Sequence, residues 1–458
     1  MKKSVCPPLS ECPPTKWGGS APPLRFSSAP PPKIPKNKPW ALRICLGAYK
    51  TTPLSSLYAE SNINSLACRR QLSNLKYYFR VLQIERQYRH FSIEDNKYDL
   101  AFKSSAVQNT LGVKVRDALC NYKLENYKIL NVKPLQIPPW FIDSLDICFN
   151  VNETAKGDSS PEELKQLFHE HKHKHNNKVS MYTDGSKSML GTGAAVVVYS
   201  SACSGSKGDV YKIKLNRITS VFSAELHAIK SAVNSLKNAK HTSCTIYSDS
   251  KSALQAILKY DSQNPIVQAI HLLLLQISEN NTKIQFCWVP AHCSIKGNEM
   301  ADKAAKEAIK LSKNCNYPVL YSDMKAFLNQ VFKEKWETDW QSKLNNKLFN
   351  VDNTIGKRDF GGFNTRLDEI KFTRLRLGHT GLTNKYLLMG DFQPVCSVCN
   401  SFLTIYHILI ECPKYEVKRK FIFGNYELKI GDILERGNSH KIYSVISFLK
   451  SINFYYEI

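Results

Sequence analysis

The sequence has no apolar run of about 18 residues, and its N-terminus carries no positively flanked apolar segment. It therefore predicts neither a membrane-spanning helix nor a secretory signal. The 14 cysteines are scattered through 458 residues and form no small-domain disulfide framework. We expect a soluble intracellular protein, cytoplasmic or nuclear, with reduced thiols and no membrane partner.

Acidic residues are few relative to basic ones. The chain has 39 Asp and Glu against 63 Lys and Arg, which gives a formal net charge of +24. An excess of this size most often marks a polyanionic partner such as nucleic acid, although charge alone also fits a basic, solvated surface. The hydrophobic content of 43% is ordinary for globular protein. The length allows roughly two to four domains.

Composition divides the first part of the chain into three segments. Residues 1–39 hold 11 of the 21 prolines, a composition that favours a disordered tail. Residues 40–137 show apolar side chains at helical intervals with basic residues between them, as in "SLACRRQLSNLKYYFRVLQ", and predict a basic helical unit. Residues 138–177 are interpreted as a linker. Its His/Lys tract from His169 to His175 could bind metal, but a solvated spacer is the favoured interpretation.

The period of the pattern changes after the linker. Five strands are predicted in "VSMYTDGS", "GTGAAVVVYS", "DVYKIKLNR", "SCTIYSD" and "KIQFCWVPAH", with four helices after the third, fourth and fifth of them. The order βββαβααβα predicts an α/β domain over residues 178–312, with a five-stranded mixed sheet and flanking helices. Residues 313–458 are predicted to be mainly helical, with a cysteine cluster.

Four acidic residues occupy notable positions in this domain. Asp184 and Asp249 are predicted to end the first and fourth strands. Glu225 lies near the start of the first helix, and Asp302 lies on the last. Each also has an ordinary explanation: Asp184 as a turn residue before Gly185, Asp249 as a helix N-cap, Glu225 as a first-turn acid favoured by the helix dipole, and Asp302 as a solvated helical residue.

Jointly, two strand ends and two helices can bring four carboxylates to one edge of a sheet. Carboxylates in contact repel one another, so such a cluster needs cations. Hard oxygen ligands select Mg²⁺ or Mn²⁺, and a pair of these ions suits in-line displacement at phosphorus. The pattern therefore favours phosphodiester hydrolysis.

The four blocks that hold these acids are "MYTDGSK", "FSAELHAI", "IYSDSKSAL" and "WVPAHCSIKGNEMADKAAKEA", with 41, 24 and 53 residues between successive acids. In content and order they resemble the type-1 ribonuclease H domain. The resemblance implies a ribonuclease H-like fold and a set of catalytic residues that bind two Mg²⁺ (or Mn²⁺) ions: Asp184, Glu225, Asp249 and Asp302. It also implies that His292 assists protonation or product departure. Without the motif, His292 is equally well an ordinary loop histidine.

Departures from the family are small. This chain has Ala291-His292-Cys293 where the family more often has Gly-His-Ser, and neither change removes a ligand. Asn298 and Glu299 share a helical face with Asp302 and are candidates to support the ligands. The resemblance implies that the substrate is an RNA/DNA hybrid, read through its minor groove. Further polar contacts with it are expected from Asn216, Ser223 and Ser252.

A second candidate site lies in "CSVCNSFLTIYHILIEC". Three thiols and an imidazole at this spacing predict a closed tetrahedral Zn²⁺ site with a structural role. The alternative is a buried apolar hairpin whose cysteines are inert core residues. The residues concerned are Cys396, Cys399, His407 and Cys412.

The flanks carry another resemblance. "ALRICLGAYKTTPLSSLYAESNINSLACRRQLSNLKYYFRVLQ" resembles the segment that follows the reverse-transcriptase palm in Jockey-like non-LTR retrotransposon polyproteins. The cysteine cluster, with "TRLRLGHTGLTNKYLL" before it and "ECPKY" after it, resembles their C-terminal tail. No Tyr/Phe-x-Asp-Asp polymerase signature occurs. We therefore expect the C-terminal part of such a polyprotein, without its palm and without DNA synthesis of its own.

Two functions of different class are open. One is an endoribonuclease that cuts the RNA strand of RNA/DNA hybrids, leaving 3′-OH and 5′-phosphate ends; we expect it to be a monomer, with a reverse transcriptase as a partner in trans. The other is a catalytically silent, nucleic-acid-binding remnant of a mobile element. The complete set of acids and His292 favour the enzyme. A transposase or integrase fits less well, because Glu225 and the His292 block belong to ribonuclease H.

Overall fold

The computed structural model describes residues 40–84, 110–133, 145–149, 161–174, 177–200, 208–238, 243–312, 317–356, 359–424 and 428–458. The predicted proline-rich tail lies outside these ranges, as do parts of the predicted helical unit and linker. Among the helices of the described ranges, none is both long and apolar enough to cross a lipid bilayer.

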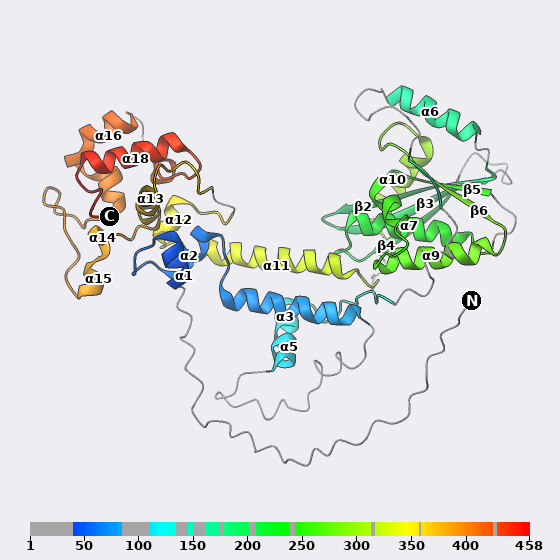
Figure 1. The fold of residues 1–458 in the computed structure, drawn as a ribbon, viewed down its shortest axis with the longest axis horizontal. Coiled ribbons are helices and arrows are strands. Elements are labelled where there is room, and N and C mark those ends of the chain that lie inside the picture. The colour runs from blue at the N-terminus through cyan, green and yellow to red at the C-terminus, as the bar shows by residue number, and fades with distance from the viewer. Residues whose placement is uncertain are drawn as a thin grey trace, which may run out of the picture.

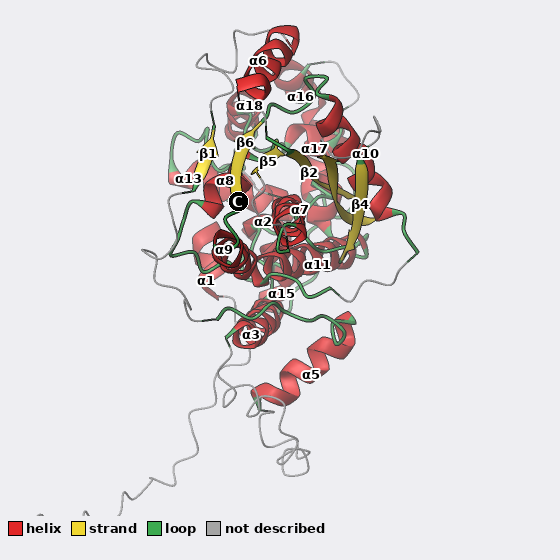
Figure 2. Cartoon of the chain, turned by 90° about the vertical axis from the view of Figure 1, so that its right-hand side faces the viewer, coloured by secondary structure: helices red, strands yellow, loops and turns green. Residues whose placement is uncertain are grey.

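A mixed sheet of six strands forms the centre of the α/β part of the chain (Figure 1). Its order is β1-β6-β5-β2-β3-β4. Figure 2 labels β1, β6, β5, β2 and β4 in that order from left to right. The adjacent pairs β1–β6, β6–β5 and β5–β2 run parallel, whereas β3 is antiparallel to both β2 and β4. The strands are β1 (Asp146–Cys148), β2 (Val179–Ser188), β3 (Gly191–Ser200), β4 (Asp209–Leu215), β5 (Ser243–Ser248) and β6 (Lys283–Trp288).

The sixth strand is a correction to the predicted five. β1 lies inside the stretch interpreted as a linker and pairs with β6 at the edge of the sheet. Three residues are too few for a period-2 pattern to be recognised. The other five strands and the order βββαβααβα are confirmed.

Helices cover both faces of the sheet. The helices α7 (Val221–Ser235), α8 (Lys251–Ile257) and α9 (Pro265–Ser278) pack on one face, and α6 (Pro161–Lys174) and α10 (Lys296–Ile309) on the other. Neighbouring residues of β2 show the alternation: Met181 joins the core with Leu226 of α7, and Tyr182 joins the opposite core with Phe168 of α6. Because both faces are buried, β3 carries a continuous apolar run.

Helices from both flanks of the domain pack together. In Figure 1, α3 (Leu66–Gln83) lies alongside α11 (Tyr321–Gln341), between the sheet and the C-terminal helices, and α5 (Leu111–Tyr122) packs on α3. Phe79 of α3 and Leu328 of α11 are buried in their shared core.

The C-terminal helices form a separate core that also receives the first helices of the described chain. α1 (Trp40–Leu46) and α2 (Leu54–Ser61) pack here, since buried Glu60 accepts from Arg376 Nε at 2.9 Å and from Arg436 Nε at 2.7 Å. The mainly helical character predicted for both terminal regions is confirmed. The C-terminal elements are α12 (Lys347–Val351), α13 (Arg366–Leu377), α14 (Gly381–Asn384), α15 (Tyr386–Met389), the π-helix η2 (His407–Glu411), the 3-10 helix η3 (Pro413–Tyr415), α16 (Glu416–Phe423), α17 (Ile430–Ile433) and α18 (Ser439–Ser451).

Candidate active site

Three of the predicted acids meet at one edge of the sheet. One carboxylate oxygen each from Asp184, Glu225 and Asp249 lies within 4.8 Å of the other two. The three line a cavity of about 320 Å³ together with His292 and Asp302. The structure therefore brings all five predicted catalytic residues to one cavity.

Asp184 does not end its strand, contrary to the prediction. β2 continues to Ser188 and pairs Asp184 with Ala195 of β3. What stops is the pairing with β5, whose last residue, Ser248, lies opposite Thr183. The Asp-Gly pair is thus not the hairpin turn that it resembles.

Asp249 follows the last residue of β5 and so lies at the same edge as Asp184. The N-cap of α8 is Ser250, whose hydroxyl oxygen accepts from the backbone N–H of Ala253 at 3.4 Å. This excludes the explanation of Asp249 as the N-cap, and its carboxylate faces the cavity instead.

Glu225 reaches the cavity because α7 comes very close to β2. A Cβ at Gly185 would lie 2.5 Å from the backbone nitrogen of Glu225 and 2.8 Å from the Ala224 Cβ. Only glycine allows this approach. Glu225 lies beyond the first turn of α7, which contains no acid, so it is not the first-turn residue of the ordinary explanation.

Burial gives Asp184 and Glu225 unusual protonation behaviour. Asp184 is 6% exposed and Glu225 is 5% exposed. Burial, followed by the charges of Asp249 and Asp302, raises the pKa of Asp184 to about 7. Burial and the charge of Asp184 raise the pKa of Glu225 well above its ordinary value.

One oxygen of each of these two acids, Asp184 Oδ2 and Glu225 Oε2, is buried and has no hydrogen-bond partner in the described part of the chain. Buried carboxylate oxygens are normally paired or coordinate metal. The donor set consists of hard oxygens, which suits Mg²⁺ or Mn²⁺. The residues therefore fit the predicted metal ions.

Asn298 and Trp288 hold Asp249 in place. The Asn298 amide donates to Asp249 Oδ2 at 3.1 Å, and the Trp288 indole donates to the Asp249 carbonyl at 3.0 Å. Burial raises the pKa of Asp249, against the hydrogen bond from Asn298 and the charge of His292. Asn298 was expected to support the predicted metal ligands, and it makes a direct hydrogen bond to one of them, Asp249.

His292 lies on the loop between β6 and α10. Its side chain is exposed and its backbone has a φ of 58°, in the left-handed region that few residues other than glycine adopt. The loop thereby presents the imidazole to the cavity while leaving it open to solvent.

Asp302 lies at the rim of the cavity. Its side chain is 30% exposed and pairs with Lys306 Nζ, one turn later on α10, at 2.7 Å. Among the described residues it is not part of the close group made by the other three acids. Lys306 was not singled out from the sequence, although its i,i+4 spacing from Asp302 is a signal for such a pair.

The remaining predicted contact residues divide into two groups. Ser252 and Glu299 line the cavity. Ser223 is buried and accepts a hydrogen bond from Ser220, and Asn216 accepts from the Ile218 backbone. Val221 and Phe222 line the cavity as well, and no sequence signal distinguished these two apolar residues.

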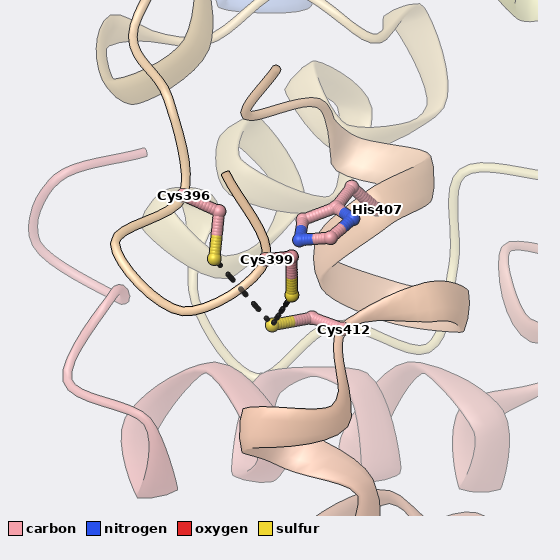
Figure 3. A group of neighbouring side chains, drawn as sticks. All are labelled: Cys396, Cys399, His407 and Cys412. Carbon is pink, nitrogen blue, oxygen red and sulfur yellow. Dashed lines mark hydrogen bonds between the residues drawn. The ribbon is translucent and has the colours of Figure 1, made fainter. Parts of the chain in front are cut away.

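The predicted zinc ligands also meet, in the C-terminal core (Figure 3). One ligand atom from each of Cys396, Cys399, His407 and Cys412 lies within 4.8 Å of the others. The Cys412 sulfur is 3.8 Å from both other sulfurs. Sulfurs bound to one tetrahedral zinc at about 2.3 Å lie about 3.8 Å apart.

His407 is oriented as a ligand. Its Nδ1 lies 3.3 Å from Glu411 Oε2 and 3.4 Å from the Ser401 hydroxyl. Its Nε2 is buried and has no hydrogen-bond partner within the described ranges. Backbone N–H groups of the hairpin lower the pKa of the Cys396 thiol to about 6. A thiolate and an oriented imidazole fit zinc better than the alternative of inert core cysteines.

Comparison with known proteins bears on the α/β part of the chain. Residues 176–310 match the family model of RNase H. No curated protein matches the chain. The match and the six-stranded mixed sheet support a ribonuclease H domain that contains the acid cluster, and such a domain implies binding of nucleic acid.

Proposed function

We propose that this chain is an endoribonuclease that hydrolyses the RNA strand of RNA/DNA hybrids and leaves 3′-OH and 5′-phosphate ends. The carrying observation is the group of buried acids, with unsatisfied oxygens, inside the segment that matches RNase H. Carboxylates in such a place either hold protons or, when ionised, need cations to offset their mutual repulsion. The proposal assigns the domain to residues 178–312.

In this proposal, Asp184, Glu225, Asp249 and Asp302 would hold two Mg²⁺ ions. Bound there, the ions would supply activation of water and stabilisation of the leaving oxygen for in-line displacement at phosphorus. Metal binding requires ionised carboxylates, so it competes with the protons that burial favours on Asp184 and Glu225.

Side chains of the protein position the acids and supply a proton to the leaving group. Asn298 fixes the Asp249 carboxylate through the 3.1 Å hydrogen bond. His292, exposed at the mouth of the cavity, delivers a proton to the departing 3′ oxygen. Lys306 compensates the charge of Asp302 at the rim.

Substrate approach is electrostatic. Three exposed lysines lie on α8 and α10, two of the elements that line the cavity, and they draw the phosphate backbone toward the acids. Ser252 is a proposed contact with the substrate at the cavity edge. The lysines are Lys251, Lys296 and Lys303.

The Cys396 cluster is proposed to bind a structural Zn²⁺, and the flanking helices to belong to a retrotransposon-derived protein that works with a reverse transcriptase in trans. The support is the ligand geometry for zinc, and the sequence resemblance for the origin.

A panel of labelled substrates tests the proposed activity. With Mg²⁺, the full chain should cut only the RNA strand of a hybrid and leave double-stranded RNA, single-stranded RNA and duplex DNA intact. The products should carry a 3′-OH that a polymerase extends. Binding of the hybrid without cleavage would instead favour the other function, a catalytically silent protein that binds nucleic acid.

A further inference from the structure

Three more metal-ligating side chains meet on the α6 face of the sheet. They are Cys148 on β1, His171 on α6 and Cys287 on β6, and one ligand atom of each lies within 4.8 Å of the other two. The Cys287 sulfur is 4.0 Å from His171 Nδ1. This group shares no residue with the acid cavity or with the C-terminal cysteine cluster.

The two cysteines meet through strand register. β1 and β6 are parallel neighbours, and Cys148 lies directly opposite Cys287. Opposed residues of neighbouring strands point to the same face. Cys287 is fully buried and Cys148 is half-buried beneath α6.

The histidine comes from the tract that was interpreted as a solvated spacer. Residues 161–174 form helix α6 instead, and Phe168 anchors it in the core of the sheet. His171 is three residues further on the same helical face and is half-buried, whereas His169 and His173 are exposed. His175 lies outside the described residues. Of the described histidines in the tract, only His171 faces the sheet.

The chemistry of this group differs from that of the acid site. Two thiols and an imidazole suit a borderline or soft ion such as Zn²⁺ and not Mg²⁺. Around a tetrahedral zinc, sulfur and nitrogen ligands lie about 3.5 Å apart. The observed 4.0 Å between Cys287 and His171 requires a shift of about half an ångström. With three protein ligands, a tetrahedral zinc here would take a water molecule as its fourth ligand.

We propose that Cys148, His171 and Cys287 bind one Zn²⁺ ion, which links the edge strand β1 and helix α6 to β6. β1 has only three residues and a single neighbouring strand. A metal that links residues 148, 171 and 287 closes two long loops at once and holds this short edge strand in register. The proposal does not depend on nuclease activity.

Zinc content of the full chain, purified with reductant and freed of unbound metal, tests this site. The wild type should hold about two zinc ions per chain, one for each cluster. Cys148→Ser and His171→Asn should each lose about one, and Cys396→Ser should lose the other. Cys244→Ser, which alters a buried β5 thiol outside both clusters, should lose none.

Cobalt provides a second readout. Co²⁺ loaded in place of zinc should show thiolate charge-transfer absorption that falls in Cys148→Ser and stays in Cys244→Ser. Circular dichroism establishes that each variant is folded, and His171→Asn leaves the thiols of Cys148 and Cys287 unchanged. Unchanged zinc content in both Cys148→Ser and His171→Asn would overturn the site. So would peptide mapping that finds a Cys148–Cys287 disulfide in the protein purified with reductant.

Discussion

At Gly185 the lack of a side chain decides whether two acids can meet. The residue after Asp184 lies against the backbone of α7, where a Cβ would be 2.5 Å from the Glu225 nitrogen. Neither the backbone nor Ala224 can yield without moving the helix. The Asp-Gly pair therefore serves close packing, and it is not the hairpin turn that such a pair often forms.

Gly185→Ala is expected to lower the free energy of unfolding by about 1–3 kcal/mol, because α7 must shift. Displacing Glu225 by about 1 Å should also reduce hybrid cleavage by roughly 100-fold. Chemical unfolding and initial cleavage rates measure the two effects. Gly356→Ala is the matched control, since a Cβ there meets nothing within 4 Å; equal behaviour of the two variants would contradict the packing argument.

The protonation of Asp184 predicts how stability depends on pH without divalent metal. Its pKa rises from 3.8 to about 7 on folding. The protonated form is thus favoured in the fold, so the stability that it contributes is complete below pH 3.8 and is lost as pH rises through about 7. Each pH unit in this window costs about 1.4 kcal/mol, which gives roughly 3 kcal/mol between pH 5 and pH 8.

Unfolding at pH 5 and pH 8, in buffer without Mg²⁺ and without chelator, measures this loss. Asp184→Asn should flatten the dependence and be more stable than the wild type at pH 8. Asp261→Asn, at an exposed position, should keep the wild-type slope. Identical slopes for all three proteins would contradict the raised pKa of Asp184.

At the scale of elements, strong periodicity made the fold predictable. Alternating or continuous apolar runs predicted β2 to β6, and stripes at helical spacing predicted α7 to α10. β1 was not predicted, because three residues show no period. Helix α6 was not predicted either, because its polar, histidine-rich composition hid the apolar face around Phe168. The acids were predictable because each sits at a fixed place in its block, whereas Cys148, His171 and Cys287 are joined only by the tertiary structure.

The Cys396 cluster is expected to hold its part of the C-terminal core together. Cys412→Ser should remove about one zinc ion per chain and lower the stability of the C-terminal helices by several kcal/mol, because metal binding adds to folding free energy. Zinc content and limited proteolysis between residues 390 and 424 measure this. Cys45→Ser changes an exposed cysteine and serves as the control. Full zinc and full protease resistance in Cys412→Ser would restore the inert-cysteine interpretation.

At the scale of the whole molecule, the first helices of the described chain belong with its last ones. Glu60 of α2 is fully buried and pairs with Arg376 and Arg436, and Arg376 also contacts Asp352 at 3.2 Å. These partners lie about 300 residues or more from Glu60 in sequence, so no local pattern could reveal them. In sequence, the α/β domain therefore lies between two segments that fold against each other (Figure 1).

Glu60→Gln is expected to destabilise the C-terminal unit by about 3–5 kcal/mol, because it leaves two buried guanidinium groups without their shared carboxylate. Glu435→Gln breaks the exposed pair with Lys441 and should change stability by less than about 1 kcal/mol. Chemical unfolding of both variants makes the comparison. A small effect at Glu60 would show that α2 does not depend on this network.

The most direct test of the central claim is Mg²⁺-dependent cleavage of a labelled RNA/DNA hybrid by the wild type, Asp184→Asn and Asp261→Asn, with hybrid binding measured on the same preparations. We expect that all three proteins bind, that the wild type and Asp261→Asn cut the RNA strand, and that Asp184→Asn is slower by at least about 1,000-fold, since losing a metal ligand removes several kcal/mol of transition-state stabilisation. Equal cutting by Asp184→Asn, or binding without cutting by the wild type, would contradict the proposed nuclease.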